Sequence, residues 1–290
     1  MDRRVGVRRH RERSGAAVAR GAPWYAAAMP FARAADGTRL YYEVMGSGPP
    51  LLLVAGQAQD RGVWAGARDD FAARHRVIVF DHRGTGDSDK PAQPPYSTRG
   101  FAGDAIAILD ELGVARAHVY GVSMGGRIGQ WLAIDHAARV GALVLGCTTP
   151  GNAHGVPRPP EVTPALTSGD PLRMLPYLVT PAWAEAHPAF LHGVAAGVAS
   201  RPVPAYARQL HYQASEAHDA WDQLPAITAP TLVIHGADDL VNVPENAPLL
   251  ADRIAGAELH LLPGARHAYF WEFRPGASDL VLEFLSRHAV

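Results

Sequence analysis

The sequence predicts an α/β fold in which a doubly wound, mostly parallel sheet carries a small helical cap. Short apolar runs that are typical of buried strands alternate with segments of helical spacing. This alternation implies right-handed crossovers between parallel strands. It stops for about eighty residues between Cys147 and Pro230 and resumes at Thr231. The interruption indicates an insertion into a single core.

The composition fits one large globular domain without a macromolecular partner. The chain has 290 residues, of which 48% are hydrophobic and 19% are charged, so it can bury a sizeable core. Its net charge of −1 gives no electrostatic case for nucleic acid or an anionic membrane. No stretch approaches the roughly twenty apolar residues that cross a bilayer. We therefore expect a small-molecule partner, and the oligomeric state stays open.

The cysteine and histidine content bears on compartment and metal binding. Cys147 is the only cysteine, so an internal disulfide is impossible and a cytoplasmic location is expected. It ends an apolar run, which favours a small buried hydrophobe over a reactive thiol. The 14 histidines are dispersed, with no His-Glu-x-x-His or Cys-x-x-Cys pairing, so we expect no metal site.

Residues 1–28 differ from the rest of the chain. They are crowded with arginine and lack a periodic apolar pattern. Their Ala-rich part is too weakly apolar for the core of an export signal, so we expect a disordered extension. Met29 begins a segment that reads as a natural N-terminus, which favours an over-extended start.

The core is predicted to comprise residues 29–148 and 229–290. Phe31–Arg33 and Leu40–Val44 flank Asp36-Gly37 and predict a β-hairpin. Continuous apolar runs, typical of strands buried on both faces, follow at 51–54, 77–80, 118–120, 143–145 and 231–234, with a further strand near 259–262. Helices are predicted around 69–73, 100–112 and 124–136, and a terminal amphipathic helix carries Leu280, Val281, Phe284 and Leu285.

Residues 149–228 form the predicted cap or lid. The segment is rich in proline and has no strand-like run, which favours short helices that begin at proline. A connection this long in a compact domain is usually functional. The alternative is an irregular surface excursion. Apolar contacts within it are expected from Trp183, Phe190, Leu210, Tyr212 and Trp221.

The sequence around Ser123 predicts a strand–turn–helix in which a serine is exposed. Gly121-Val122-Ser123-Met124-Gly125 follows a β-prone run and precedes an apolar segment of helical spacing. In this context Gly-x-Ser-x-Gly indicates a nucleophile elbow. A Cβ at Gly121 or Gly125 would collide with a neighbouring strand or helix. Free N–H groups at the start of the helix would favour developing negative charge near Ser123.

A serine nucleophile needs a base, usually histidine, and a carboxylate that orients it. The strand 231–234 runs into a loop with Asp238 and Asp239, and the strand ending near Leu262 runs into a loop with His267. Both loops follow the carboxyl ends of strands, where open α/β sheets place their sites. The chain order of serine, aspartate and histidine is that of elbow enzymes.

From Phe31 onward the chain resembles the α/β-hydrolase superfamily, in its branch of esterases, enol-lactonases and haloperoxidase-like enzymes. The matching motifs are Gly121–Gly126, Asp81–Ser88, His235–Asp239 and Pro263–His267. The resemblance implies that Asp239, three positions after Gly236, is the triad acid, while Asp238 faces solvent or caps the turn. In some relatives the acid follows the preceding strand, but Cys147-Thr148-Thr149 offers no carboxylate there.

The resemblance also implies an oxyanion hole made by the backbone N–H groups of Met124 and Gln57. Relatives usually carry His-Gly-x where this chain has Ala55-Gly56-Gln57. Because the donor is main chain, the missing histidine leaves the hole intact. The Gln57 side chain either reaches the substrate or bonds to its own loop.

Four further histidines and Arg83 are interpreted as structural. His82 and Arg83 are expected to make hydrogen bonds within a Gly-rich turn. His187, His211 and His218 are expected on solvent-facing or helix-face positions of the cap rather than as ligands.

The predicted function is hydrolysis of a carboxylic ester or lactone by Ser123, Asp239 and His267, without a cofactor. The substrate is expected to be small and apolar or aromatic, because Gln57, Tyr177, Trp183 and Trp221 are expected near the pocket. Hydrolysis of a C–C bond uses the same triad and remains an alternative. A lyase, or a ligand-binding sensor on the same fold, are alternatives from other classes. Ser123 argues against dehalogenase and epoxide hydrolase chemistry, which use a nucleophilic aspartate.

Deletion of residues 1–28 is expected to leave the melting temperature and the esterase activity unchanged, since this segment contributes no periodic apolar pattern to a core. Thermal denaturation and turnover of p-nitrophenyl acetate by full-length and truncated protein test this. A large loss of either property would show that the segment belongs to the folded domain.

Overall fold

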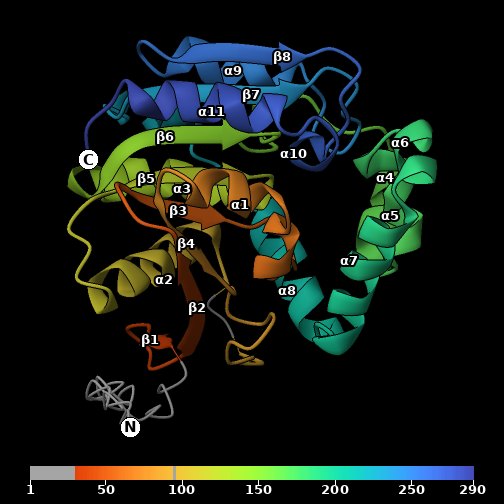
Figure 1. The fold of residues 1–290 in the computed structure, drawn as a ribbon, viewed down its shortest axis with the longest axis horizontal. Helices are drawn as coiled ribbons and strands as arrows, with labels where there is room; N and C mark the ends of the chain where they lie inside the picture. Colours follow the sequence, from red (N-terminus) through yellow and green to blue (C-terminus); the bar gives the residue numbers. More distant parts are fainter. Residues whose placement is uncertain (1–29, 94–95) are drawn as a thin grey trace, which may run out of the picture.

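The computed structural model describes residues 30–93 and 96–290, and an eight-stranded sheet forms its centre (Figure 1). The strand order is β1-β2-β4-β3-β5-β6-β7-β8. β2 pairs antiparallel with β1 and β4, and all other neighbours are parallel. This confirms the predicted fold class. The strand bounds are β1 Phe31–Arg33, β2 Arg39–Met45, β3 Pro50–Val54, β4 Arg76–Phe80, β5 Ala117–Val122, β6 Val140–Gly146, β7 Thr231–Gly236 and β8 Glu258–Leu262.

Helices cover both faces of the sheet. One buried apolar cluster joins α2, α3 and α9 to one face, and a second joins α1, α10 and α11 to the other. The bounds are η1 Arg61–Trp64, α1 Ala67–Ala72, α2 Thr98–Glu111, α3 Met124–Asp135, η2 Ala137–Arg139, α9 Asn246–Arg253, α10 Tyr269–Glu272 and α11 Gly276–Ser286.

The continuous apolar runs of the central strands arise from this two-sided burial. In β3, Leu52 and Val54 point into one cluster, whereas Leu51 and Leu53 point into the other, and all four are fully buried. Because successive side chains of a strand face opposite sides, both sets must be apolar. The sequence therefore identified these strands by their lack of polar alternation.

Helix α9 has no counterpart among the predicted helices. Its segment is only eight residues long and contains Pro248, a residue that usually interrupts helices. Asn246 at its start is fully buried, and its side-chain oxygen accepts a hydrogen bond from the Val156 N–H at 2.9 Å. Packing against β7 and β8 and contacts to a distant loop stabilise this helix, and such tertiary contacts leave no local pattern.

Residues 149–228 contain short helices and no strand, as predicted. They are α4 Val162–Ser168, α5 Pro171–Leu178, α6 Pro181–Ala186, α7 Pro188–Ser200, α8 Ala205–Glu216 and η3 Trp221–Ala226. α5, α6 and α7 begin at proline, whose fixed φ suits the first helical turn. Helices α4–α7 stand beyond the arrowhead ends of β6 and β8, and α8 leads from them back toward α1 (Figure 1). We refer to α4–α8 as the cap helices.

In the described part of the chain, no helix combines the length and the apolar character that a membrane crossing requires. The expectations for residues 1–28 lie outside the described residues.

His82 and His118 are two of the buried histidines, and both are uncharged. His82 and His118 are at most 1% exposed, and the Nδ1 atom of each has no hydrogen-bond partner among the described residues. Burial lowers the pKa of His82 to about 4, and burial together with the neighbouring His75 lowers the pKa of His118 to about 4. In the unfolded chain these side chains bind protons at the ordinary pKa of about 6.5. Protonation therefore favours the unfolded state.

The free energy of unfolding is expected to fall as the pH drops from 7.5 to 5. The folded-state pKa values of His82 and His118 lie below the unfolded ones, so their contribution is complete above pH 6.5 and is lost below it. The loss is on the order of 2 kcal/mol per histidine at pH 5. Urea unfolding at the two pH values measures it.

His118→Phe should reduce this pH dependence, whereas His260→Gln, at an exposed position, should preserve it. An unchanged pH dependence in His118→Phe would contradict the assignment of His118 as an uncharged core group.

Candidate active site

Ser123 lies at a sharp turn between β5 and α3. Its backbone has φ 57° and ψ −122°, a strained conformation for a residue with a Cβ. Two neighbouring residues hold the turn. The Ser123 N–H donates to the Gly146 carbonyl at 2.9 Å, and the Thr148 hydroxyl donates to the Ser123 carbonyl at 2.7 Å. The hydroxyl of Ser123 is thereby presented at the carboxyl edge of the sheet.

Two glycines make this turn possible. A Cβ on Gly121 would collide with the Gly125 carbonyl, and a Cβ on Gly125 would collide with the Val54 carbonyl of β3. Backbone atoms cannot move aside as a flexible side chain can. The close approach of α3 to β3 and β5 therefore requires glycine at both positions, as the sequence pattern predicted.

Asp239 is a buried carboxylate beside His267. Its Oδ2 atom lies 2.8 Å from His267 Nδ1, and its Oδ1 atom accepts hydrogen bonds from the N–H groups of Val241 and Asn242 at 2.7 and 3.1 Å. Burial opposes the charge, but the His267 and His235 imidazoles outweigh it and lower the pKa of Asp239 to about 2. The group is therefore ionised at neutral pH.

Of the two adjacent carboxylates, the structure buries Asp239 and exposes Asp238. The predicted division of roles, with Asp238 facing solvent, matches this placement. The Asp238 N–H donates to the Ala265 carbonyl at 2.9 Å, so its backbone helps to join the two loops.

The hydrogen bond with Asp239 fixes the tautomer of His267. A carboxylate only accepts, so Nδ1–H donates to it and Nε2 of the neutral ring is left to accept a proton. His267 is also tied to the cap, because its N–H donates to the Tyr177 carbonyl at 3.4 Å and the Ala268 N–H donates to the Leu178 carbonyl at 2.8 Å. Movement of α5 would therefore move the base.

The sheet register brings the loops that carry Ser123, Asp239 and His267 to one edge. Val122 pairs with Gly146, Gly146 pairs with Ile234, and Gly236 pairs with Leu262. Within the described residues, His267 is hydrogen-bonded to Asp239 but not to the Ser123 hydroxyl. Bonds of this kind are often long in ligand-free enzymes and tighten when substrate binds.

Two backbone N–H groups are available near Ser123. Met124 is the first residue of α3, and Gln57 follows Gly56 in the loop after β3. In the described part of the chain, neither N–H has a hydrogen-bond acceptor. A Cβ on Gly56 would lie 3.4 Å from the Ser123 Cβ, which places this loop against the serine.

Gln59 is a residue of this loop that the sequence analysis did not identify. Its Oε1 atom accepts a hydrogen bond from the Gly56 N–H at 3.1 Å. It therefore braces the peptide just before Gln57. The only sequence signal was a second glutamine two residues after the one we selected.

Histidines from two segments support the same loop. His82 Nε2 lies 3.0 Å from the Ala55 carbonyl, which fits its predicted structural role. The Ala58 N–H donates to His211 Nδ1 at 3.2 Å, so His211 Nε2–H donates to the Arg83 carbonyl at 2.8 Å. Arg83 has a structural role, as predicted, but it acts through ion pairs with Asp104 of α2 and with Asp36, which both lie outside the Gly-rich turn.

His211 lies on a helix face, one of the two kinds of position expected for it, whereas the expectation for His218 is wrong. His211 belongs to α8 and is fully buried, and His218, just after α8, is 3% exposed between the Thr98 hydroxyl and the Gln130 side chain. The inner face of α8 packs on the sheet-edge loops, and a polar side chain buried there must be hydrogen-bonded. His187 is exposed, as expected.

The three aromatic residues predicted to bind substrate lie in three different parts of the structure. Trp183 stacks on His187 within the cap at a centroid distance of 4.3 Å, and Tyr177 reaches the site through its carbonyl. None of the four predicted substrate-binding residues, Gln57, Tyr177, Trp183 and Trp221, lines the cavity between α7 and η1, and Trp221 lies elsewhere in the fold. Its ring stacks on His154 at 4.9 Å and lies under the Arg253 guanidinium at 4.1 Å, so it anchors η3 to α9 instead of lining the pocket.

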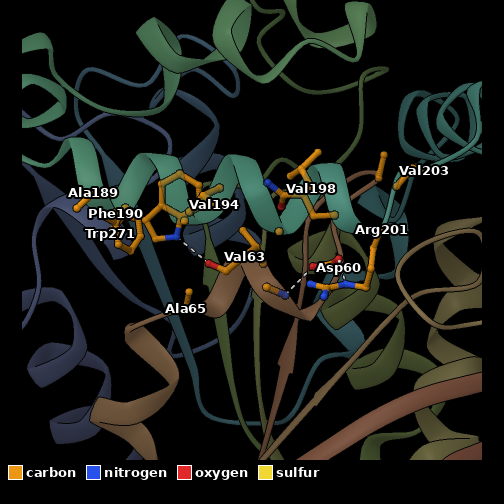
Figure 2. A pocket seen from close by; sticks show the side chains of 15 residues that line it. Asp60, Val63, Ala65, Ala189, Phe190, Val194, Val198, Arg201, Val203 and Trp271 are labelled. Carbon is orange, nitrogen blue, oxygen red and sulfur yellow. Dashed lines mark hydrogen bonds and ion pairs between the residues drawn. The ribbon is translucent and has the colours of Figure 1, made fainter.

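A cavity of about 380 Å³ lies between α7 and the segment around η1 (Figure 2). Phe190 and Trp271 gather at one end, and Asp60 and Arg201 lie toward the other. Its wall also includes Gln59. Because the wall is contributed by segments about 130 residues apart, no local sequence pattern predicts the cavity.

Cys147 lies beside Asp239 and His267. Donor atoms of Cys147, Asp239 and His267 lie within 4.8 Å of one another, and these residues form the one such group among the described residues. Burial raises the pKa of the Cys147 thiol well above its ordinary value. A protonated thiol is a poor metal ligand, and Asp239 and His267 bind each other. The cysteine is buried, in agreement with its predicted role.

Comparisons with known proteins place this chain among hydrolases. A family model described as "alpha/beta hydrolase fold" matches residues 49–273. "Putative carbamate hydrolase RutD" of Variovorax paradoxus is 33% identical over 267 residues, covering 86% of this chain and 96% of that protein. A 2-hydroxy-6-oxononadienedioate/2-hydroxy-6-oxononatrienedioate hydrolase of Burkholderia vietnamiensis is 33% identical, covering 87% and 93%. The enol-lactonase of Burkholderia xenovorans LB400 superposes with a TM-score of 0.76 at 30% identity, covering 89% and 100%.

Proposed function

Since this chain belongs to the alpha/beta hydrolase fold family, we propose that it is a serine hydrolase that cleaves a carboxylic ester or lactone of a small apolar molecule. The observation that carries the proposal is the 2.8 Å hydrogen bond between His267 Nδ1 and the buried Asp239 carboxylate. It leaves His267 Nε2 as a proton acceptor on the edge of the sheet that also presents Ser123.

The proposed reaction begins with attack of the Ser123 hydroxyl on the substrate carbonyl. His267 Nε2 takes the hydroxyl proton, and the ionised Asp239 stabilises the imidazolium that forms. The N–H groups of Met124 and Gln57 would donate to the oxyanion of the tetrahedral intermediate. Loss of one such donor typically costs on the order of 3 kcal/mol in activation free energy.

To complete acylation, His267 gives the proton to the leaving alkoxide, and the bond between this oxygen and the carbonyl carbon breaks. A covalent acyl-enzyme on Ser123 results. Water, deprotonated by His267, then attacks the acyl carbonyl, and Ser123 leaves as the free hydroxyl. These steps need only groups of this chain and water.

Hydrolysis of a C–C bond is the second candidate function. It is supported by the 33% identity to the Burkholderia vietnamiensis 2-hydroxy-6-oxononadienedioate hydrolase. The same serine, histidine and aspartate would serve, but the leaving group would be a carbanion equivalent that must be protonated on carbon. Comparison of p-nitrophenyl esters with a 2-hydroxy-6-oxo-dienoate as substrates separates the two candidates.

Ser123→Ala is expected to lower kcat/KM for p-nitrophenyl acetate by about 10⁴-fold or more, because the nucleophile is lost. Asp239→Asn should lower it by about 10³–10⁴-fold, because the amide favours the wrong His267 tautomer. Steady-state turnover at pH 7.5 measures both effects, and circular dichroism checks that the variants fold.

Asp238→Asn is the matched control, since it removes an exposed carboxylate next to the buried one. It should retain the wild-type kcat/KM. Wild-type-like turnover in Ser123→Ala, or equal losses in Asp238→Asn and Asp239→Asn, would overturn the assignment.

A further inference from the structure

One face of α7 forms the outer wall of the cavity and is built around small residues. Ala189, Gly193 and Gly197 recur every four residues, so they lie on one side of the helix. A Cβ on Gly193 would meet no atom within 4 Å. Gly193 lines the cavity although it is partly open to solvent, so a side chain at this position has room to enter the cavity.

The inner wall of the cavity comes from the loop that leads away from Ser123. Gln59 lines the cavity, and its Oε1 atom would lie 2.6 Å from a Cβ on Gly56. The same Cβ would lie 3.4 Å from the Ser123 Cβ. Gln59 and Ser123 therefore both lie close to Gly56, so the wall of the cavity approaches the candidate nucleophile without including it.

An ion pair closes one end of the cavity without giving it net charge. Arg201 Nε donates to Asp60 Oδ2 at 2.9 Å, and Asp60 Oδ1 accepts the Gly62 N–H at 2.7 Å (Figure 2). Both Asp60 oxygens are therefore occupied. Because the charges of the pair cancel, a carboxylate that entered the cavity would lose its hydration without gaining an unpaired cation.

The remaining wall is apolar or aromatic. Val63, Val194 and Val198 line the middle, and Phe190 and Trp271 meet edge to face at a centroid distance of 5.5 Å. The Trp271 indole N–H is already used, since it donates to the Val63 carbonyl at 2.7 Å. These side chains would bury an apolar group of a ligand, and they offer it no hydrogen-bond donor at the middle of the cavity.

We propose that the cavity holds a neutral, unbranched acyl chain of medium length and that Gly193 sets the length it accepts. The inference rests on the proposed ester hydrolysis and adds the substrate class: an ester or lactone whose acyl part is a neutral aliphatic chain. A larger side chain at residue 193 would occupy the space of the distal methylenes but would not reach the carbonyl beside Ser123.

The test compares wild-type protein with Gly193→Phe on p-nitrophenyl acetate and p-nitrophenyl octanoate. The wild type should prefer octanoate, and Gly193→Phe should lower kcat/KM for octanoate by about tenfold or more, the effect of losing the burial of roughly two methylenes. Its kcat/KM for acetate should stay within about twofold. Equal losses on the two esters, or none on octanoate, would overturn the proposal.

Gly103→Phe is the matched control. Gly103 is an exposed glycine of α2, and a Cβ there also meets no atom within 4 Å. This variant should keep the wild-type ratio of octanoate to acetate activity. Mono-p-nitrophenyl suberate, whose chain ends in a carboxylate, should be a poorer wild-type substrate than octanoate. Preference for suberate would contradict the neutral-chain assignment.

A binding measurement separates this proposal from the proposed function. Nonan-2-one, a neutral ketone with a comparable chain, should bind wild type and Gly103→Phe and should bind Gly193→Phe at least tenfold more weakly, by calorimetry. If no ester is hydrolysed but this pattern holds, the proposed function fails and the chain site stands. If esters are hydrolysed but nonan-2-one binds all three proteins equally, the chain site fails.

Discussion

The close approach of α3 to β3 and β5 is the constraint on which the arrangement of the site depends. Backbone passes against backbone at Gly121 and Gly125, where any Cβ would collide with a carbonyl oxygen. This contact forces Ser123 to a positive φ and turns its hydroxyl out of the sheet. It also places the N-terminus of α3 beside the loop that carries Gln57. The packing of α3 against β3 and β5 therefore maintains the strained backbone of Ser123.

The ionised Asp239 and its partner His267 lie on the loops next to this turn. The Asp239 carboxylate is buried but stays ionised, because two backbone N–H groups and two imidazoles surround it. His267 in turn is bound through the main chain to α5 of the cap. The cap helix α8 braces the Gln57 loop through His211. The cap is thus joined to the base and to the proposed oxyanion donors, and it also supplies one wall of the cavity.

The sequence was sufficient for the sheet, for the sharp turn at Ser123 and for the pairing of a buried Asp239 with His267, whereas their role as a triad stays a prediction. Buried parallel strands require continuous apolar runs, the elbow requires glycines around Ser123, and the family pattern separated Asp239 from Asp238. His211, Gln59 and the cavity could not be predicted in this way. The Ala58–His211 hydrogen bond joins residues 153 positions apart, so it follows from how the cap docks. The prediction for Trp221 failed for the same reason, since the sequence does not indicate which surface an aromatic residue of the cap packs against.

The most direct test of the account is the detection of a covalent acyl group on Ser123. Wild-type protein mixed with p-nitrophenyl butyrate and quenched in acid during turnover should carry one butyryl group, which peptide mass spectrometry should locate at Ser123. His267→Ala should show no such species on the same time scale, because the hydroxyl would lack its base. Continued turnover by the wild type with no butyryl group on Ser123, or with the group on another residue, would contradict the central role of this serine.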